Sequence, residues 1–198
     1  REFIRWHKDG RYVHIFNPSS LPLSLFSIAL ILTRSTNLTW GQEIATTQLF
    51  PPHMYLVIFL VSLPGQVLFG VSRMTLAAVV TSYLLIGFDY FVIGMHIFES
   101  PTIPIAVFLG MHLLFTDPST SPRTELGRIM FGVLYGASVV ALYVLLERLG
   151  VPTFYDKLLC VPLLNLAMQR INHVVKAIGR SEILHKLAGS PRRVFTRE

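Results

Sequence analysis

Residues 17–22 read NPSSLP, and roughly a hundred residues later residues 117–122 repeat the phrase as DPSTSP. An apolar segment follows each copy. Asn and Asp are preferred helix N-caps, because their side-chain oxygens accept amide hydrogens of the first turn, and Pro suits the first helical position. Each copy therefore predicts a helix start, with Asn17 and Asp117 as caps. In a membrane protein, repeated capped starts indicate an internal repeat and a binding site at helix N-termini. The alternative is a coincidence of two turn motifs.

The composition indicates a membrane protein. Hydrophobic residues make up 52% of the chain and charged residues only 14%, whereas soluble domains average about 25% charged residues. The single cysteine, Cys160, excludes a disulfide framework or a multi-cysteine metal site within this chain. We expect no metal site and no nucleic-acid partner.

Six apolar segments predict an all-α polytopic membrane protein of about six transmembrane helices. A full crossing needs roughly 20 residues, so the second, third and fifth segments are long enough and the other three are short. Short segments are typical of broken or re-entrant helices that other helices cover. The segments are residues 19–33, 54–72, 74–97, 102–115, 129–146 and 158–171.

The basic residues predict the orientation of these helices. Of the 17 Lys and Arg residues, a six-span arrangement leaves only Arg34, Arg148 and Lys157 on one side of the membrane. By the positive-inside rule, the richer side is cytoplasmic. We therefore expect both termini and both repeated phrases to lie in the cytoplasm.

The chain divides into a transmembrane domain, residues 1–172, and a basic tail, residues 173–198. In the tail, apolar residues such as Val174 and Ile178 alternate with Lys176 and Arg180 at roughly helical spacing. This pattern predicts an amphipathic helix on the inner leaflet or on a partner subunit. A solvated tail attracted to anionic lipid is the alternative.

The second phrase carries a resemblance to a known family. Residues 116–132, TDPSTSPRTELGRIMFG, resemble the TDP-x-TSP-x-T-x-x-GR-x-x-x-G signature of the RnfD/NqrB family of membrane proteins. FNPS at residues 16–19 and WG at residues 40–41 are similar to the short, UnbU-like branch of that family. The resemblance implies a helical bundle of the bacterial inner membrane, built from inverted repeats. It also implies a non-catalytic membrane subunit of an electron-transfer complex, with other membrane subunits and the lipid bilayer as partners.

The same resemblance implies FMN or riboflavin as the candidate cofactor. Members that bind FMN covalently attach it to the last residue of an S/T-G-A-T/S motif, which this chain lacks. The nearest string is EIATTQL at residues 43–49, where Thr46 or Thr47 would be the attachment residue. Both are otherwise ordinary loop threonines, and we do not expect covalent attachment.

Four further residues are candidates for cofactor binding: Asn17, Asp117, Thr120 and Arg128 all lie in or beside the repeated phrases. Asp117 can cap a helix, bind a cation or orient Arg128 toward a flavin phosphate. Arg128 either marks the cytoplasmic interface or forms the cationic end of an isoalloxazine or quinone pocket, where negative charge develops. His112 is a weak candidate for a haem or pigment ligand, with a structural role as the alternative.

Two further features lie within the apolar segments. Asp89 lies inside the third segment, and intramembrane carboxylates are functional by default. Gly132 and Gly136 form a GxxxG element, which permits close helix approach and indicates packing, within the chain or against a partner. Two alternatives to a redox subunit remain: a cofactor-free scaffold subunit of a larger membrane assembly, including one that holds pigment or haem, and a small-solute channel.

Overall fold

The computed structural model describes residues 5–8, 11–41, 43, 53–94, 97–98 and 102–188. A β-hairpin opens the chain, with β1 (Arg5–Lys8) antiparallel to β2 (Arg11–His14). The rest of the described chain is helical, which confirms the helical fold class. The elements after the hairpin are α1 (Ser20–Leu32), η1 (Thr36–Leu38), α3 (His53–Leu68), α4 (Ser72–Ile93), α5 (Ile105–Leu109), η2 (Gly110–Leu114), α6 (Glu125–Arg148), η3 (Thr153–Tyr155) and α7 (Asp156–Ala188).

Three helical segments of the described chain are long and apolar enough to cross a membrane, which confirms a membrane protein. They are Ser72–Ile93, Glu125–Arg148 and Thr153–Ile178. The predicted lengths were wrong for two segments. The second segment forms a helix of only 16 residues, α3, because the chain turns at Gly70, whose φ of 65° lies in the left-handed region. The sixth is longer than predicted, because its helix continues past residue 171 to Ala188.

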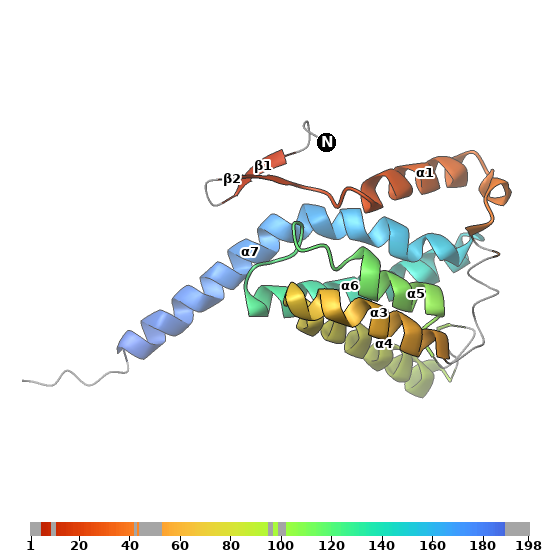
Figure 1. Cartoon of the computed structure of the whole chain (residues 1–198). Helices are drawn as coiled ribbons and strands as arrows, with labels where there is room; N and C mark the ends of the chain where they lie inside the picture. The colour runs from red at the N-terminus through yellow and green to blue at the C-terminus, as the bar shows by residue number, and fades with distance from the viewer. Residues whose placement is uncertain are drawn as a thin grey trace, which may run out of the picture.

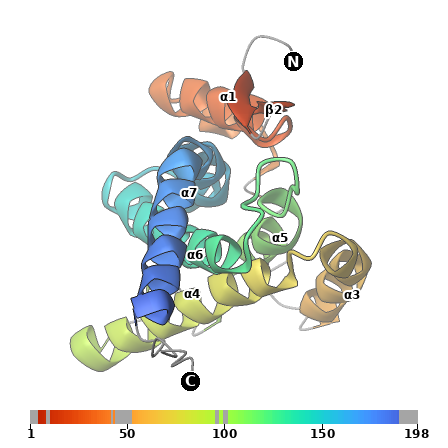
Figure 2. The same cartoon turned by 90° about the vertical axis from the view of Figure 1, so that its left-hand side faces the viewer.

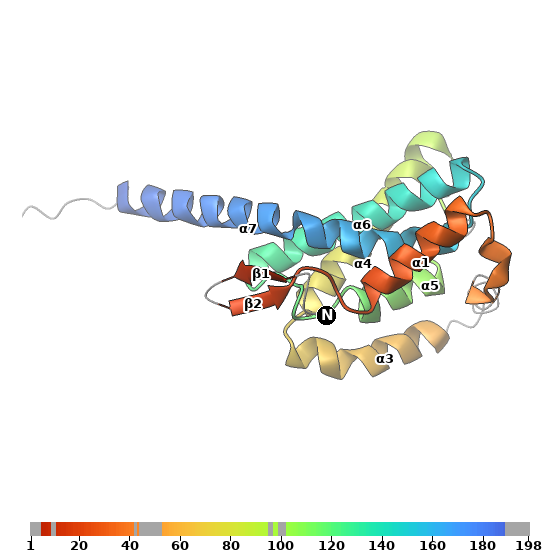
Figure 3. The ribbon, with the colours of Figure 1, turned by 90° about the horizontal axis from the view of Figure 1, so that it is seen from above.

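The helices form a bundle in which successive segments run back and forth in alternating directions (Figures 1 and 3). α6 lies at the centre, with α4 and α7 packed against it, and α1 covers α7 (Figure 2). α5 and η2 form a short helix of two parts, and η2 is a single π-helical turn. π-Helical turns inside helices occur frequently at functional sites.

The α4–α6 interface depends on two glycines of α6. A Cβ atom added at Gly136 would lie 2.5 Å from the carbonyl oxygen of Ala78, and one at Gly132 would clash with the carbonyl oxygen of Met74. Ser82 Oγ donates a hydrogen bond of 3.4 Å to the Gly136 carbonyl. The GxxxG element therefore packs within the chain, which confirms its interpretation as a packing motif.

α1 turns its polar face inward. Ser20, Ser24 and Ser27 are buried, and Ser24 Oγ donates hydrogen bonds to the Ser20 carbonyl at 2.8 Å and to the Leu158 carbonyl of α7. Small hydroxyl residues let the two backbones approach closely. Leu25 and Phe26 of α1 are more than half exposed. This polar-inside, apolar-outside pattern fits a helix that faces lipid.

α7 continues unbroken past residue 172, so the predicted domain boundary falls inside a single helix. Its 33 residues correspond to roughly 50 Å, whereas the hydrocarbon core of a bilayer is about 30 Å thick. The C-terminal part of α7 accordingly projects beyond the bundle (Figure 1). Residues 189–198 of the predicted tail lie outside the described residues.

Candidate functional site

The first phrase lies at a helix start, as predicted, although the N-cap residue of α1 is Ser19 and Asn17 lies two residues before it. Asn17 is buried, and its Oδ1 atom accepts hydrogen bonds from the backbone N–H of Ser19 at 2.9 Å and of Ser20 at 3.3 Å. The Ser19 hydroxyl donates to the same oxygen at 2.6 Å. These bonds satisfy amides that have no partner within the helix, and α1 begins at Ser20.

The second phrase repeats this local geometry but does not cap the helix that follows it. Asp117 accepts hydrogen bonds from the Ser119 N–H at 3.0 Å, from the Ser119 hydroxyl at 2.7 Å and from the Thr120 hydroxyl at 3.2 Å. However, α6 begins only at Glu125, where Thr124 is the N-cap and accepts from the Gly127 N–H at 3.1 Å. The prediction that Asp117 caps the next helix was therefore wrong.

The second phrase forms a turn although both phrases have a proline at the same place. A residue before proline is disfavoured in the helical conformation, yet Leu21 precedes Pro22 within α1, whereas Ser121 precedes Pro122 in the turn. The Ser121 hydroxyl bonds back to the Asp117 carbonyl at 2.6 Å. Asp117 thus closes a compact turn, and Thr124 is the residue that caps α6.

The two phrases meet in space. Asn17 Nδ2 donates a hydrogen bond of 2.8 Å to the carbonyl of Leu114, the last residue of η2 and close before Asp117 in the chain. The last carbonyls of a helical segment have no partner within it, so Asn17 satisfies a carbonyl at the end of η2 while its Oδ1 accepts from amides at the start of α1. The sequence predicted a repeat but did not identify this direct contact between its copies.

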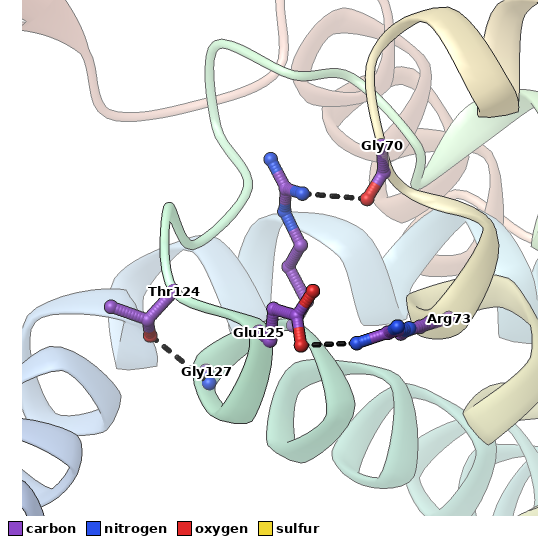
Figure 4. Close-up of polar contacts among 6 residues, drawn as sticks. Gly70, Arg73, Thr124, Glu125 and Gly127 are labelled. Carbon is purple, nitrogen blue, oxygen red and sulfur yellow. Dashed lines mark hydrogen bonds and ion pairs between the residues drawn. The ribbon is translucent and has the colours of Figure 1, made fainter.

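Arg128 joins the second phrase to the turn between α3 and α4. Its Nε donates to the Pro122 carbonyl at 3.1 Å. Its Nη1 donates to the Gly70 carbonyl at 2.6 Å (Figure 4). An exposed ion pair between Arg73 and Glu125 lies beside it. Two nitrogens of the Arg128 guanidinium are thus bound to backbone carbonyls at the end of the bundle that holds both phrases.

His112 is the remaining candidate that the structure describes. His112 is buried, its Nδ1 lies 2.8 Å from the Phe108 carbonyl, and its ring centroid is 4.0 Å from that of Phe108. These contacts give His112 a packing role. Thr46 and Thr47 lie outside the described residues. No group of three His, Cys, Asp or Glu residues that could hold a metal occurs in the described ranges.

Sequence patterns do not reveal a buried ionic cluster at the start of α7. Asp156 is fully buried and Lys157 is 6% exposed, and Lys157 Nζ lies 3.3 Å from Asp156 Oδ1. The ammonium also donates to the Phe154 carbonyl at 2.6 Å and lies 4.2 Å from the centroid of the Phe154 ring. The six-span arrangement counts Lys157 among the three basic residues of the poorer side. The structure adds that this lysine is buried in the bundle and paired with an acid.

The side chains of Asn17 and Asp117 should differ in their effect on stability. Asn17→Ala removes a buried group with partners in both α1 and η2, and the loss of such hydrogen bonds leaves buried polar groups unsatisfied at a cost of about 1–3 kcal/mol each. Asp117→Ala acts on a half-buried local turn and should cost less. Thermal unfolding in detergent would measure both, and equal losses would contradict a bridging role for Asn17.

Comparison with known proteins adds no relative, since no family model, curated protein or solved structure matches this chain.

Proposed function

We propose that this protein is an integral membrane subunit of an electron-transfer complex, without catalytic activity of its own. The observation that carries the proposal is the stretch of residues 116–132, which resembles the RnfD/NqrB signature. Asp117 and Arg128 of this stretch lie at the same end of the bundle as Asn17 of the first phrase. A noncovalent FMN or riboflavin is the cofactor that the proposal implies.

The proposal includes six membrane passes, with both termini in the cytoplasm of a bacterial cell. The alternating course of α1, α3, α4, α5–η2, α6 and α7 supports it, as do the apolar outer faces of α1 and α4. The ion pair of Lys157 also supports the charge asymmetry. Its charge is balanced by Asp156, so only Arg34 and Arg148 remain as free basic residues on the poorer side.

Thiol labelling tests this orientation. Cys160 is fully buried and gives a low background, whereas Ser119 and Leu149 are exposed at opposite ends of the bundle. Ser119→Cys should react with a membrane-impermeant maleimide only in inside-out vesicles, and Leu149→Cys only in right-side-out vesicles. Labelling of both positions from one side would exclude the proposed topology.

The cofactor is tested by the visible spectrum and intact mass of the purified protein, before and after denaturation. We expect a flavin spectrum that is released by denaturation, with an unmodified mass at the peptide that contains Thr46 and Thr47. A matching mass increase at that peptide would instead establish covalent attachment. A colourless protein of unmodified mass, with no extractable quinone, would exclude a redox carrier.

A cofactor-free scaffold subunit is the second candidate, and one observation favours it. The polar atoms of Asn17, Asp117 and Arg128 bond to the chain's own backbone and hydroxyl groups. These bonds give the signature residues a structural role that needs no cofactor. A colourless protein of unmodified mass, with no extractable quinone, would favour the scaffold subunit.

A further inference from the structure

The buried cluster at the start of α7 contains polar atoms that its own bonds do not satisfy. Asp156 Oδ1 accepts from the Lys157 backbone N–H and, at 3.3 Å, from Lys157 Nζ. Asp156 Oδ2 is buried without a hydrogen-bond partner in the described chain, and so is the hydroxyl oxygen of Tyr135 on α6. An unpartnered buried polar group costs about 1–3 kcal/mol, so two in one cluster require an explanation.

The two unpartnered groups belong to one neighbourhood. A Cβ atom added at Gly110 would lie 3.0 Å from the Tyr135 hydroxyl and 3.2 Å from Lys157 Cβ. The phenol and the first residues of α7 therefore converge on the same point of η2. Gly110 begins the π-helical turn, and its lack of a side chain leaves room for this convergence. Lys157 is the ionisable group that acts electrostatically on Asp156, and Asp156 in turn acts on the side chains of Tyr135 and Cys160.

We propose that Tyr135, Asp156 and Lys157 form an internal proton-binding site. The geometry distinguishes the two carboxylate oxygens, because Oδ1 is held by Lys157 while Oδ2 is the acceptor that remains. One proton from water adds to Oδ2, and Lys157 keeps its own proton, so the neutral pair becomes a carboxylic acid beside an ammonium. Release of the proton to water restores the ion pair. The Tyr135 hydroxyl, through one bridging water molecule, is the partner of Oδ2.

The surroundings of the cluster fit a site at one end of the bundle. The half-buried Phe154 ring covers the Lys157 ammonium, and a Cβ atom added at Gly41 would lie 3.1 Å from that ring. The loop after α1 thus closes over the turn that leads into α7. Ionisable residues inside membrane segments are rare and mark proton relays and ion pathways. The site does not depend on electron transfer and stands if the protein proves colourless.

Infrared difference spectroscopy of the full chain across a pH titration tests the site. We expect a carboxylic acid C=O band that shifts in D2O and disappears in Asp156→Asn. Asp89→Asn is the matched control, because Asp89 is a half-buried acid of α4 and its replacement should leave this band unchanged. A titration with no band that depends on Asp156, while the protein stays folded, would overturn the proposal.

Tyr135→Phe keeps every charge and tests the partner of Oδ2 even where Asp156→Asn does not fold. If the phenol bonds to Oδ2, its loss should shift the Asp156 band and lower the unfolding midpoint by about 2–4 °C, the change expected for one hydrogen bond in a chain of this size. Tyr155→Phe, which removes a hydroxyl outside this set of unpartnered atoms, should change neither. If Tyr135→Phe leaves the Asp156 band unchanged and raises the unfolding midpoint, the Tyr135 hydroxyl has no partner, and the proposed site is refuted.

Discussion

Lys157→Met is expected to destabilise the protein by about 3–5 kcal/mol, because removal of one partner leaves the other charge buried and unpaired. Asp156 would lose the ammonium 3.3 Å from its Oδ1 and would stay fully buried. Methionine has a similar length to lysine, so the loss would report the missing charge more than a cavity. Thermal or denaturant unfolding in mixed micelles, followed by circular dichroism, would measure it.

Two further variants make this result interpretable. The double variant Asp156→Asn, Lys157→Met removes both charges and should recover most of the lost stability, since neutral replacement of a buried pair is often nearly neutral. Arg148→Met removes an exposed charge at the end of α6 and should cost no more than about 0.5 kcal/mol. If Lys157→Met were tolerated as well as Arg148→Met, the pair would not be buried in the bundle.

Gly132→Ala is expected to destabilise the bundle by about 1–3 kcal/mol, the usual cost of overpacking. The added methyl group would meet the carbonyl oxygen of Met74 and lie 3.0 Å from Ala77 Cβ. Backbone cannot yield as a flexible side chain can, so α4 and α6 would have to separate. The loss should appear in the unfolding midpoint of the purified protein.

Gly87→Ala is the matched control, because the same change there should have the opposite sign. No atom lies within 4 Å of a Cβ atom added at Gly87 in α4. Alanine is favoured over glycine in a helix by up to about 1 kcal/mol, so this variant should be slightly stabilised. Two losses of similar size would contradict the assigned α4–α6 contact.

Local patterns predicted much of the fold. The third and fifth segments form α4 and α6 close to their predicted bounds, because long apolar runs specify a helix without reference to their neighbours. The sequence did not predict the turn at Gly70, because the apolar run of residues 67–71 continues on both sides of this single left-handed residue. Gly132 and Gly136 predicted packing but not the helix they pack against.

The candidate site was predicted in part. The Asx-Pro-Ser phrases predicted side-chain hydrogen bonds to nearby amides, and both phrases form them, because such bonds span only a few residues. The cap at Asp117 was wrong because the choice between Asp117 and Thr124 depends on where α6 packs. The Asn17–Leu114 bond joins residues 97 positions apart, a separation at which local sequence carries no signal.

Composition, apolar segments and the repeated phrase predicted a helical membrane protein with local side-chain to backbone bonds at both phrases, since each of these signals acts within a short stretch of chain. The packing of distant segments decided the rest. It buried the adjacent charges of Asp156 and Lys157, brought Tyr135 and Gly110 to the same point, and placed the Arg128 guanidinium against the Gly70 carbonyl. A buried charge and an exposed charge are the same letter in the sequence, and only the neighbours supplied by other helices distinguish them.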